Sequence, residues 1–309
     1  MKRAIITGPT GSIGIALINK LISEGVTVMA VVRPGSKRAD RIPQSPQVIK
    51  VSCDLSDLSK LPSMIKEKAD VFYHFGWDGT FGNSRNNMQG QNLNVRYALD
   101  AVEAAAAIGC DMFVGAGSQA EYGRFEGKLS ASTPAFPENG YGMAKLCAGQ
   151  MTRVLCEQKN IKHVWTRILS IYGPFDGENT MVMSTVYKLL NGERPACTKG
   201  EQMWDYLYSK DAALAMYLIG ENGISGKTYC IGSGSVNPLK TYIENIKDAV
   251  NREAEVGYGE VPYAPKQVMY LCADIDELTR DTGFRPEYTF EQGIRETVQW
   301  CRANANKGK

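Results

Sequence analysis

The 309-residue sequence has little histidine and no excess of charge of either sign. Thirty-five lysines and arginines stand against 33 aspartates and glutamates, and no basic run could follow a phosphate backbone. We therefore expect no nucleic-acid partner. The two histidines, His74 and His163, lie separately in apolar segments, so the sequence favours neither a histidine-dependent hydrolase nor a zinc site.

Long hydrophobic runs and closely paired cysteines are also missing. No apolar stretch reaches the roughly 20 residues that a membrane-spanning helix needs. Glycines interrupt the first apolar run before the core of a signal peptide could form. The eight cysteines are scattered without a C-x-x-C pair. We therefore expect a cytoplasmic protein with reduced thiols, no membrane partner and no metal ion.

Apolar runs rich in valine and isoleucine alternate with helical patterns along the first half of the chain. This alternation is typical of βαβ units that build a parallel sheet. It predicts an α/β fold of the Rossmann type, a doubly wound parallel sheet with about six or seven strands. The predicted strands cover residues 3–7, 26–33, 48–51, 69–75, 111–115 and 161–169, and the predicted helices cover 13–23, 92–108 and 144–158.

The rhythm changes after Tyr172-Gly173-Pro174, where a loop over 175–180 precedes a predicted helix around 183–190. This mixed pattern indicates a smaller second lobe. Two later segments, 205–219 and 227–231, again have the pattern of pieces that return to the sheet. We predict a dinucleotide-binding domain over residues 1–174, with returning segments near 205–231, and a discontinuous substrate-binding lobe over 175–309.

A glycine-rich turn lies between the first predicted strand and the first predicted helix. Small residues there let backbone amides approach a pyrophosphate at the N-terminus of a helix. The spacing is G-x-x-G-x-x-G, and the alternative interpretation is a plain strand-to-helix turn. The candidate cofactor-binding residues in this turn are Thr7, Gly8, Thr10, Gly11, Ser12, Ile13 and Gly14.

The residue at the end of the second strand discriminates between the two nicotinamide dinucleotides. An acid there would bind the ribose 2′-hydroxyl of NAD, but this sequence has Arg33, followed by Ser36 and Arg38. Cations at this point can pair with a 2′-phosphate. The sequence therefore favours NADP(H), with NAD(H) possible. The alternative is a solvated surface arginine.

Tyr141 and Lys145 are four residues apart in a predicted helix, so they share one face. A nearby lysine cation stabilises tyrosinate and lowers the pKa of the phenol towards working pH. Upstream, Ser118 ends a predicted strand, where open α/β sheets bind their ligands. The hydroxyl of Ser118 could hydrogen-bond a substrate carbonyl. These three residues form the predicted catalytic set.

Together these segments resemble the extended short-chain dehydrogenase/reductases, the NAD-dependent epimerase/dehydratase family that acts on nucleotide sugars. Tyr172-Gly173-Pro174 and Gly283-Phe284-Arg285-Pro286 extend the resemblance over nearly the whole chain. It implies a nucleotide-sugar substrate and a homodimer. It also implies further cofactor contacts at Asp54, Leu55, Phe75, Gly76 and Asn94, in addition to Tyr141 and Lys145, and substrate contacts at Trp77, Ser118, Gln119, Ser170, Asn179 and Trp204. For the two tryptophans, core packing remains the alternative.

Two departures from the family pattern narrow the expected reaction. Gln119 and Ala120 occupy the places where the 4,6-dehydratases carry the acid and base for water elimination. Arg33 favours a dissociable NADP(H) over a tightly held NAD. We therefore expect NADP(H)-dependent reduction of a keto group, at C4, on a nucleotide-diphosphate sugar. The alternatives are a 4-epimerase with tightly bound NAD and a non-catalytic dinucleotide sensor.

Overall fold

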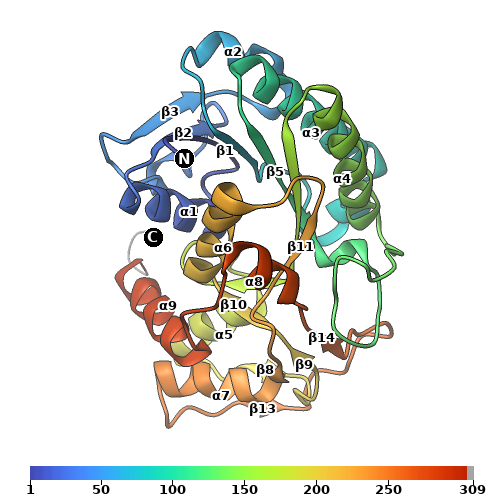
Figure 1. Cartoon of the computed structure of the whole chain (residues 1–309). Coiled ribbons are helices and arrows are strands. Elements are labelled where there is room, and N and C mark those ends of the chain that lie inside the picture. The colour runs from blue at the N-terminus through green and yellow to red at the C-terminus, as the bar shows by residue number, and fades with distance from the viewer. Residues whose placement is uncertain (305–309) are drawn as a thin grey trace.

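The computed structural model describes residues 1–304, and its largest element is a seven-stranded sheet (Figure 1). All six strand pairs are parallel, in the order β11-β6-β5-β4-β1-β2-β3. The predicted Rossmann-type fold is therefore confirmed. The strands are β1 (Arg3–Thr7), β2 (Thr27–Val32), β3 (Val48–Ser52), β4 (Val71–His74), β5 (Met112–Ser118), β6 (Lys162–Ile168) and β11 (Thr228–Ile231).

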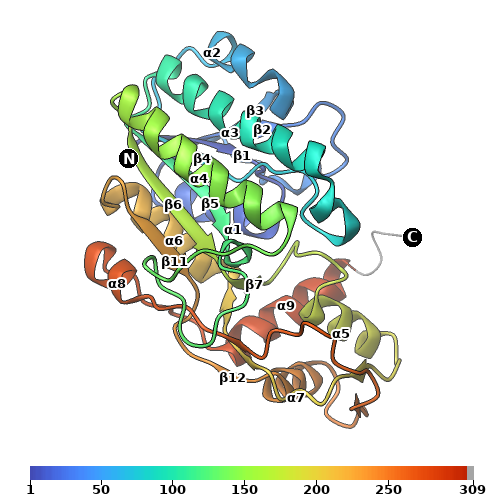
Figure 2. The same ribbon diagram turned by 90° about the vertical axis from the view of Figure 1, so that its right-hand side faces the viewer.

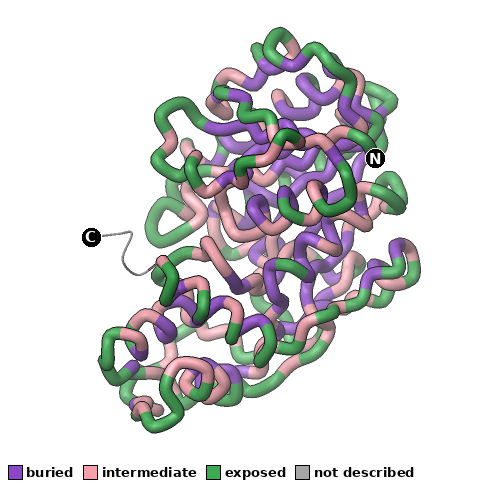
Figure 3. The backbone as a smooth tube through the Cα atoms, turned by 90° about the vertical axis from the view of Figure 1, so that its left-hand side faces the viewer, coloured by how far each residue is buried: buried purple, intermediate pink, exposed green. Residues whose placement is uncertain are grey.

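The central strands are apolar on both faces because helices cover both faces. In β1, Ala4 and Ile6 belong to one buried cluster, while Ile5 between them belongs to the other. This follows from the alternation of side chains along a strand. Figure 3 shows the resulting concentration of buried residues along the strands of the large sheet. A near-continuous apolar run therefore specifies this strand better than an alternating pattern would.

Two helices cover each face of the sheet. On one face α1 (Ser12–Ser23) packs against α6 (Ser209–Asn222). On the other, α3 (Met88–Ile108) packs against α4 (Gly140–Gln158), and both lie side by side in Figure 2. The carboxyl ends of the strands all point towards one edge, which faces the smaller lobe.

Helices α3 and α4 begin four residues earlier than their periodicity predicts. The side chain of Asn87 accepts a hydrogen bond from the amide of Gly90, and that of Asn139 accepts one from Gly142. Asparagine caps of this kind satisfy amides that the helix itself leaves unpaired. The first turns contain polar and glycine residues, which obscure the apolar period.

The smaller lobe packs three helices around its own apolar cluster. These are α5 (Met181–Leu190), α7 (Leu239–Val250) and α9 (Phe290–Asn304). The remaining short elements are η1 (Ala39–Arg41), η2 (Leu55–Lys60), α2 (Leu61–Met64), η3 (Gly82–Asn86), η4 (Gln119–Glu121), β7 (Ser170–Tyr172), β8 (Ala196–Cys197), β9 (Met203–Trp204), β10 (Tyr206–Tyr208), β12 (Asn237–Pro238), β13 (Gly257–Tyr258), β14 (Tyr270–Leu271) and α8 (Asp276–Thr282).

Of the two segments expected to return to the sheet, one adds a strand to the large sheet and the other does not. Residues 228–231 form β11, which extends the large sheet beside β6. Residues 206–208 form β10, which pairs with β7 in a separate two-stranded sheet before the chain returns as α6. Asp205, directly before β10, has a fully buried carboxylate. It accepts hydrogen bonds from the backbone amides of Ser233, Gly234 and Ala273, which ties β10 to the segments that follow β11 and β14. Satisfied in this way, a buried carboxylate is tolerated.

Candidate active site

The turn between β1 and α1 needs glycine at two positions for steric reasons. Gly8 has a φ of +67°, and a Cβ there would lie 2.7 Å from the carbonyl carbon of Phe75. A Cβ at Gly14 would lie 2.7 Å from the carbonyl oxygen of Gly8. At Gly11 a Cβ would meet nothing within 4 Å. Close packing therefore requires glycine at Gly8 and Gly14, whereas Gly11 leaves open space above the turn.

This open space lies at the N-terminus of α1, which has no side-chain cap. Gly11 is the N-cap, and Ser12, Ile13 and Gly14 form the first turn. The hydroxyl of Ser12 is buried without a hydrogen-bond partner in the described structure. Unpaired amides and a positive helix end favour an anion with several acceptor oxygens. The turn therefore fits a pyrophosphate.

A group of cations follows β2 beside this turn. Arg33 and Arg38 are exposed, and Ser36 between them is partly buried. Arg41, which the sequence analysis did not select, donates to the carbonyl of Thr10 at 3.5 Å and lies over the ring of Phe175. Burial lowers the pKa of Arg41, and the charge of Arg38 lowers it further. Within residues 1–304 none of these arginines has a carboxylate within 4 Å, so their charges can bind an anion.

Several other predicted cofactor residues meet at the carboxyl ends of β1 and β4. The hydroxyl of Thr7 accepts the amide of Gly76 at 3.2 Å and lies 2.9 Å from Nδ1 of His74. Leu55 packs closely on Gly76, because a Cβ at Gly76 would lie only 2.7 Å from Cδ2 of Leu55. Asp54, next to Leu55, caps η2 by accepting the amide of Ser56. These contacts hold the ends of β1 and β4 and the start of η2 close together beside the glycine turn.

Asn94 is buried on α3, and its side-chain amide forms two hydrogen bonds with the backbone of Asp78. It accepts the Asp78 amide at 2.9 Å and donates to the Asp78 carbonyl at 2.8 Å. These two bonds hold the loop that follows β4 and carries Trp77. Direct contact between Asn94 and a cofactor stays a prediction.

Lys145 and Tyr141 lie on α4 beneath the carboxyl end of β5. Only 3% of Lys145 is exposed, and its ammonium donates to the carbonyl of Ala116 at 2.6 Å. The same ammonium lies 3.7 Å from the centre of the Trp77 ring, a cation–π contact. Burial lowers the pKa of Lys145 to about 7, against the opposing charge of Glu121. The lysine can therefore lose its charge within the physiological range.

Tyr141 is surrounded by groups that act on its phenol in opposite directions. Burial raises the pKa of Tyr141, whereas a hydrogen bond with Ser118 and the charge of Arg85 lower it. The guanidinium of Arg85, in η3, lies 4.6 Å from the centre of the Tyr141 ring. Arg85 was not selected from the sequence, because nothing in its local pattern reveals a contact across 56 residues. The structure thus brings Ser118, Tyr141 and Lys145 together.

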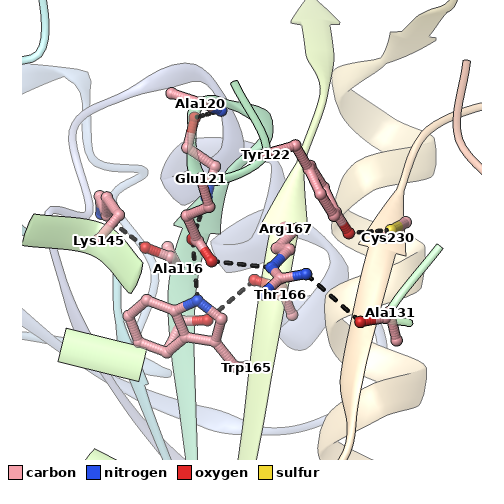
Figure 4. A network of polar contacts seen from close by, with 12 residues as sticks. Ala116, Ala120, Glu121, Tyr122, Ala131, Lys145, Trp165, Thr166, Arg167 and Cys230 are labelled. Atoms are coloured by element: carbon pink, nitrogen blue, oxygen red, sulfur yellow. Dashed lines mark hydrogen bonds and ion pairs between the residues drawn. The ribbon is translucent and has the colours of Figure 1, made fainter. Parts of the chain in front are cut away.

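Sequence reasoning also missed an ion pair directly behind this set, between Glu121 of η4 and Arg167 of β6 (Figure 4). The two groups are 2.8 Å apart, and both are buried. The spacing Ser118-x-x-Glu121 is a capping-box pattern that could have indicated the reciprocal hydrogen bonds of these two residues.

The predicted substrate residues fall into two groups. The indole of Trp204 donates to the hydroxyl of Ser170 at 2.8 Å, and Ser170 lies two residues beyond the β6 position that pairs with Ser118. Gln119 follows Ser118 directly and is partly buried. Asn179 is exposed in the loop before α5, apart from the other predicted substrate residues. Trp77 meets the Tyr141 ring edge to face, Ser118 and Gln119 lie at the end of β5, and Ser170 and Trp204 belong to the β7–β9 region.

Comparison with known proteins identifies one family. Residues 4–232 match the NAD dependent epimerase/dehydratase family. The chain is 28% identical over 188 residues to dTDP-glucose 4,6-dehydratase of Shigella flexneri, covering 58% of this chain and 52% of that protein. The chain thus spans about half the length of this relative. It is 22% identical over 303 residues to CDP-abequose synthase of Salmonella muenchen, covering 96% of this chain and 97% of the relative.

Two solved structures share the fold over almost the full length of both chains. One is UDP-glucose 4-epimerase of Thermotoga maritima with UDP-glucose, with a TM-score of 0.86, 21% identity, and coverage of 98% and 100%. The other is RMD of Pseudomonas aeruginosa complexed with NADPH, with a TM-score of 0.81, 17% identity, and coverage of 98% and 100%. At these identities the likeness describes the fold alone. In residues 1–304, no helix is long and apolar enough to cross a membrane.

Replacing Lys145 with methionine tests the burial of its charge. The pKa of Lys145 is about 7 in the fold, against about 10.4 for an unperturbed lysine. Between these values the unfolded chain binds more protons, so the free energy of unfolding of the wild type rises with pH. We expect the wild type to gain about 1 kcal/mol per pH unit relative to Lys145→Met over this window. Urea unfolding at several pH values measures the difference.

The matched control is Lys159→Met, at the C-terminal cap of the same helix, where the ammonium pairs with Glu103 at the surface. We expect no comparable trend with pH for this variant. A free-energy difference between wild type and Lys145→Met that stays constant over the window would contradict the lowered pKa.

Proposed function

The chain belongs to the NAD-dependent epimerase/dehydratase family, and we propose that it uses NADP(H) to reduce a keto group, at C4, on a nucleotide-diphosphate sugar. The observation that carries this proposal is the convergence of Ser118, Tyr141 and Lys145 at the carboxyl edge of β5. The family match makes the chain an NAD(P)-dependent enzyme of the extended short-chain dehydrogenase/reductase type. The substrate and the direction of reaction are our inference.

In this mechanism each residue acts on the substrate carbonyl. Ser118 donates a hydrogen bond to the carbonyl oxygen and orients it. Tyr141 donates its phenolic proton to that oxygen as negative charge develops on it. Lys145 stabilises the resulting tyrosinate with its positive charge, supported by Arg85 over the ring. NADPH, when bound, supplies the hydride to the carbonyl carbon.

The residues after Ser118 support reduction over dehydration. Gln119 is an amide and Ala120 is apolar, so neither can serve as the acid or base for removing water. An epimerase must retain its cofactor and return the hydride to the opposite face of the same intermediate. The exposed basic loop at Arg33 and Arg38 favours a cofactor that exchanges with solvent.

The reaction itself is tested with purified protein, NADPH and a panel of nucleotide-linked 4-keto-6-deoxysugars. We expect stoichiometric loss of NADPH absorbance with one or more members of the panel. Tyr141→Phe should lower kcat by at least ~10²-fold, the usual scale for a positioned general acid, with NADPH binding nearly unchanged. Interconversion of UDP-sugar epimers at constant NADPH absorbance would refute reduction and establish the epimerase. Binding of NADPH with neither reaction would favour the dinucleotide sensor.

The cofactor preference is tested at Arg33. The guanidinium can form a charge-assisted hydrogen bond with a 2′-phosphate, worth about 1.5–3 kcal/mol, so its loss should weaken NADPH binding about tenfold or more. We expect Arg33→Asp to raise the Kd for NADPH by this factor and to leave NADH binding equal or tighter, measured by isothermal titration calorimetry. Arg252→Asp, at an exposed site after α7, is the control. Equal or tighter binding of NADH than of NADPH by the wild type would overturn the assignment.

We further propose that two copies associate through the outer face of α3 and α4. On α4, Met143, Met151 and Val154 share one face and are 43–50% exposed, and Leu93 on the neighbouring helix is 48% exposed. Exposed apolar residues on two helices that pack side by side support an interface there. Sedimentation velocity should show a dimer for the wild type and a monomer for Met151→Glu. Ile224→Glu, an exposed apolar site beyond α6, should stay dimeric. A monomeric wild type at micromolar concentration would contradict this proposal.

A further inference from the structure

Glu121 is a carboxylate with no exposed surface, directly beside the proposed catalytic set. A buried charge is costly unless it is paired and hydrogen-bonded, so its surroundings must be built to hold it. Glu121 ends η4, three residues after Ser118. Its carboxylate neutralises the buried Arg167 and lies close enough to act on the catalytic residues as well.

Three donors hold the carboxylate in a single orientation. Oε1 accepts a hydrogen bond from the backbone amide of Ser118 at 2.8 Å. Oε1 also accepts one from the indole Nε1 of Trp165 at 3.0 Å, and Oε2 accepts one from Nε of Arg167 at 2.8 Å (Figure 4). Within the same turn, the hydroxyl of Ser118 accepts a hydrogen bond from the amide of Ala120, the residue before Glu121, at 3.2 Å. Glu121 and Ser118 therefore fix each other, and the backbone that carries the Ser118 hydroxyl cannot move independently of the carboxylate.

Glycines on two elements make room for this arrangement. A Cβ at Gly117 would lie 2.3 Å from Oε1 of Glu121, and one at Gly115 would lie 2.2 Å from the ring of Trp165. A Cβ at Gly149 would lie 2.8 Å from the same ring. Gly149 is one helical turn after Lys145, on the same face of α4. The indole that holds Glu121 therefore packs directly on the helix that carries Tyr141 and Lys145.

Glu121 also acts on Lys145 through its charge. The ammonium of Lys145 is bound to Ala116 on the same strand end, and it faces Tyr141 on its own helix, the Trp77 ring and His74 of β4. Burial keeps His74 neutral by lowering its pKa to about 3. Glu121 contributes the negative charge that opposes the effect of burial on the pKa of Lys145. Arg167 engages the other carboxylate oxygen and extends towards Ala131 and the Tyr122 ring.

We propose that Glu121 is a positioning residue for the reaction: its carboxylate fixes the backbone of Ser118 and, through Trp165, ties the end of β5 to α4, so that the Ser118 hydroxyl and the Lys145 ammonium keep their relative placement. This inference rests on the proposed function. Glu121 itself touches neither substrate nor cofactor in this mechanism. Its effect is on the geometry and charge of the residues that do.

The test uses Glu121→Gln, which retains the shape of the side chain and removes its charge. We expect kcat to fall about tenfold or more, with the Kd for NADPH unchanged. Without the negative charge, the pKa of Lys145 falls further, so the loss of its positive charge begins at lower pH. The alkaline decline of kcat should therefore move to lower pH. Glu157→Gln, exposed on α4, is the matched control and should retain the wild-type kcat and pH profile.

A second variant separates positioning from simple charge neutralisation. In Glu121→Gln the guanidinium of Arg167 is left buried and unpaired, which destabilises the fold on its own account. The double variant Glu121→Gln/Arg167→Met removes both charges. If the proposal is right, the double variant regains resistance to urea but retains the low kcat and the shifted pH profile. Recovery of both kcat and the wild-type pH profile would show that Glu121 only neutralises Arg167.

A measurement without turnover keeps this inference distinct from the proposed reaction. In protein labelled with ¹³C at lysine Cε, the resonance that disappears in Lys145→Met reports the titration of Lys145. Its midpoint should lie at lower pH in the double variant than in the wild type. If the wild type reduces no keto sugar, the proposed function fails while this shift still supports the action of Glu121 on Lys145. An unchanged midpoint would overturn the inference even if reduction is established.

Discussion

The candidate site depends on the burial of one ammonium group, that of Lys145, beneath the carboxyl edge of a parallel sheet. Such a group is strongly hydrated in water, so each contact that replaces its hydration is a structural requirement. The carbonyl of Ala116 provides one contact and the face of Trp77 another. Trp77 in turn is held by Gln91 of α3, whose side chain also bonds Gly79 and Ser84. The loop after β4 is thus ordered by the same helix that packs on α4.

The large sheet explains why residues so distant in sequence can act together. In parallel strands the carboxyl ends lie at one edge, so the turn after β1, the loop after β4 and the end of β5 open to the same side. The short ladder of β7 and β10 follows β6 and contacts the smaller lobe. The aromatic contacts among Tyr172, Tyr206 and Phe290 join that ladder to α9. The later part of the chain also enters the core of the large sheet, since Leu278 and Phe284 are buried in the same cluster as Ile6.

The sequence predicted the fold better than the site. Runs such as Ala4-Ile5-Ile6 identify buried strands because both of their faces must be apolar, and the spacing of Tyr141 and Lys145 shows the shared helix face directly. Arg41, Arg85 and Glu121 were not found, since each gains its role from a contact with a distant segment. In a local window these are ordinary charged residues. The true starts of α3 and α4 were not predicted, because an N-cap is a side-chain hydrogen bond and leaves no trace in the apolar periodicity.

The position of β11 at the end of the sheet has a consequence for biosynthesis. Until residues 228–231 have been made, β6 is an open edge, and until residues 209–222 have been made, the apolar face of α1 lacks its partner α6. An open strand edge can pair with another chain. The smaller lobe begins within that interval, so the sheet must remain incomplete while α5 is already available. A nascent chain halted after Tyr172-Gly173-Pro174 would therefore carry most of the proposed cofactor-binding residues on a sheet that is still prone to aggregate.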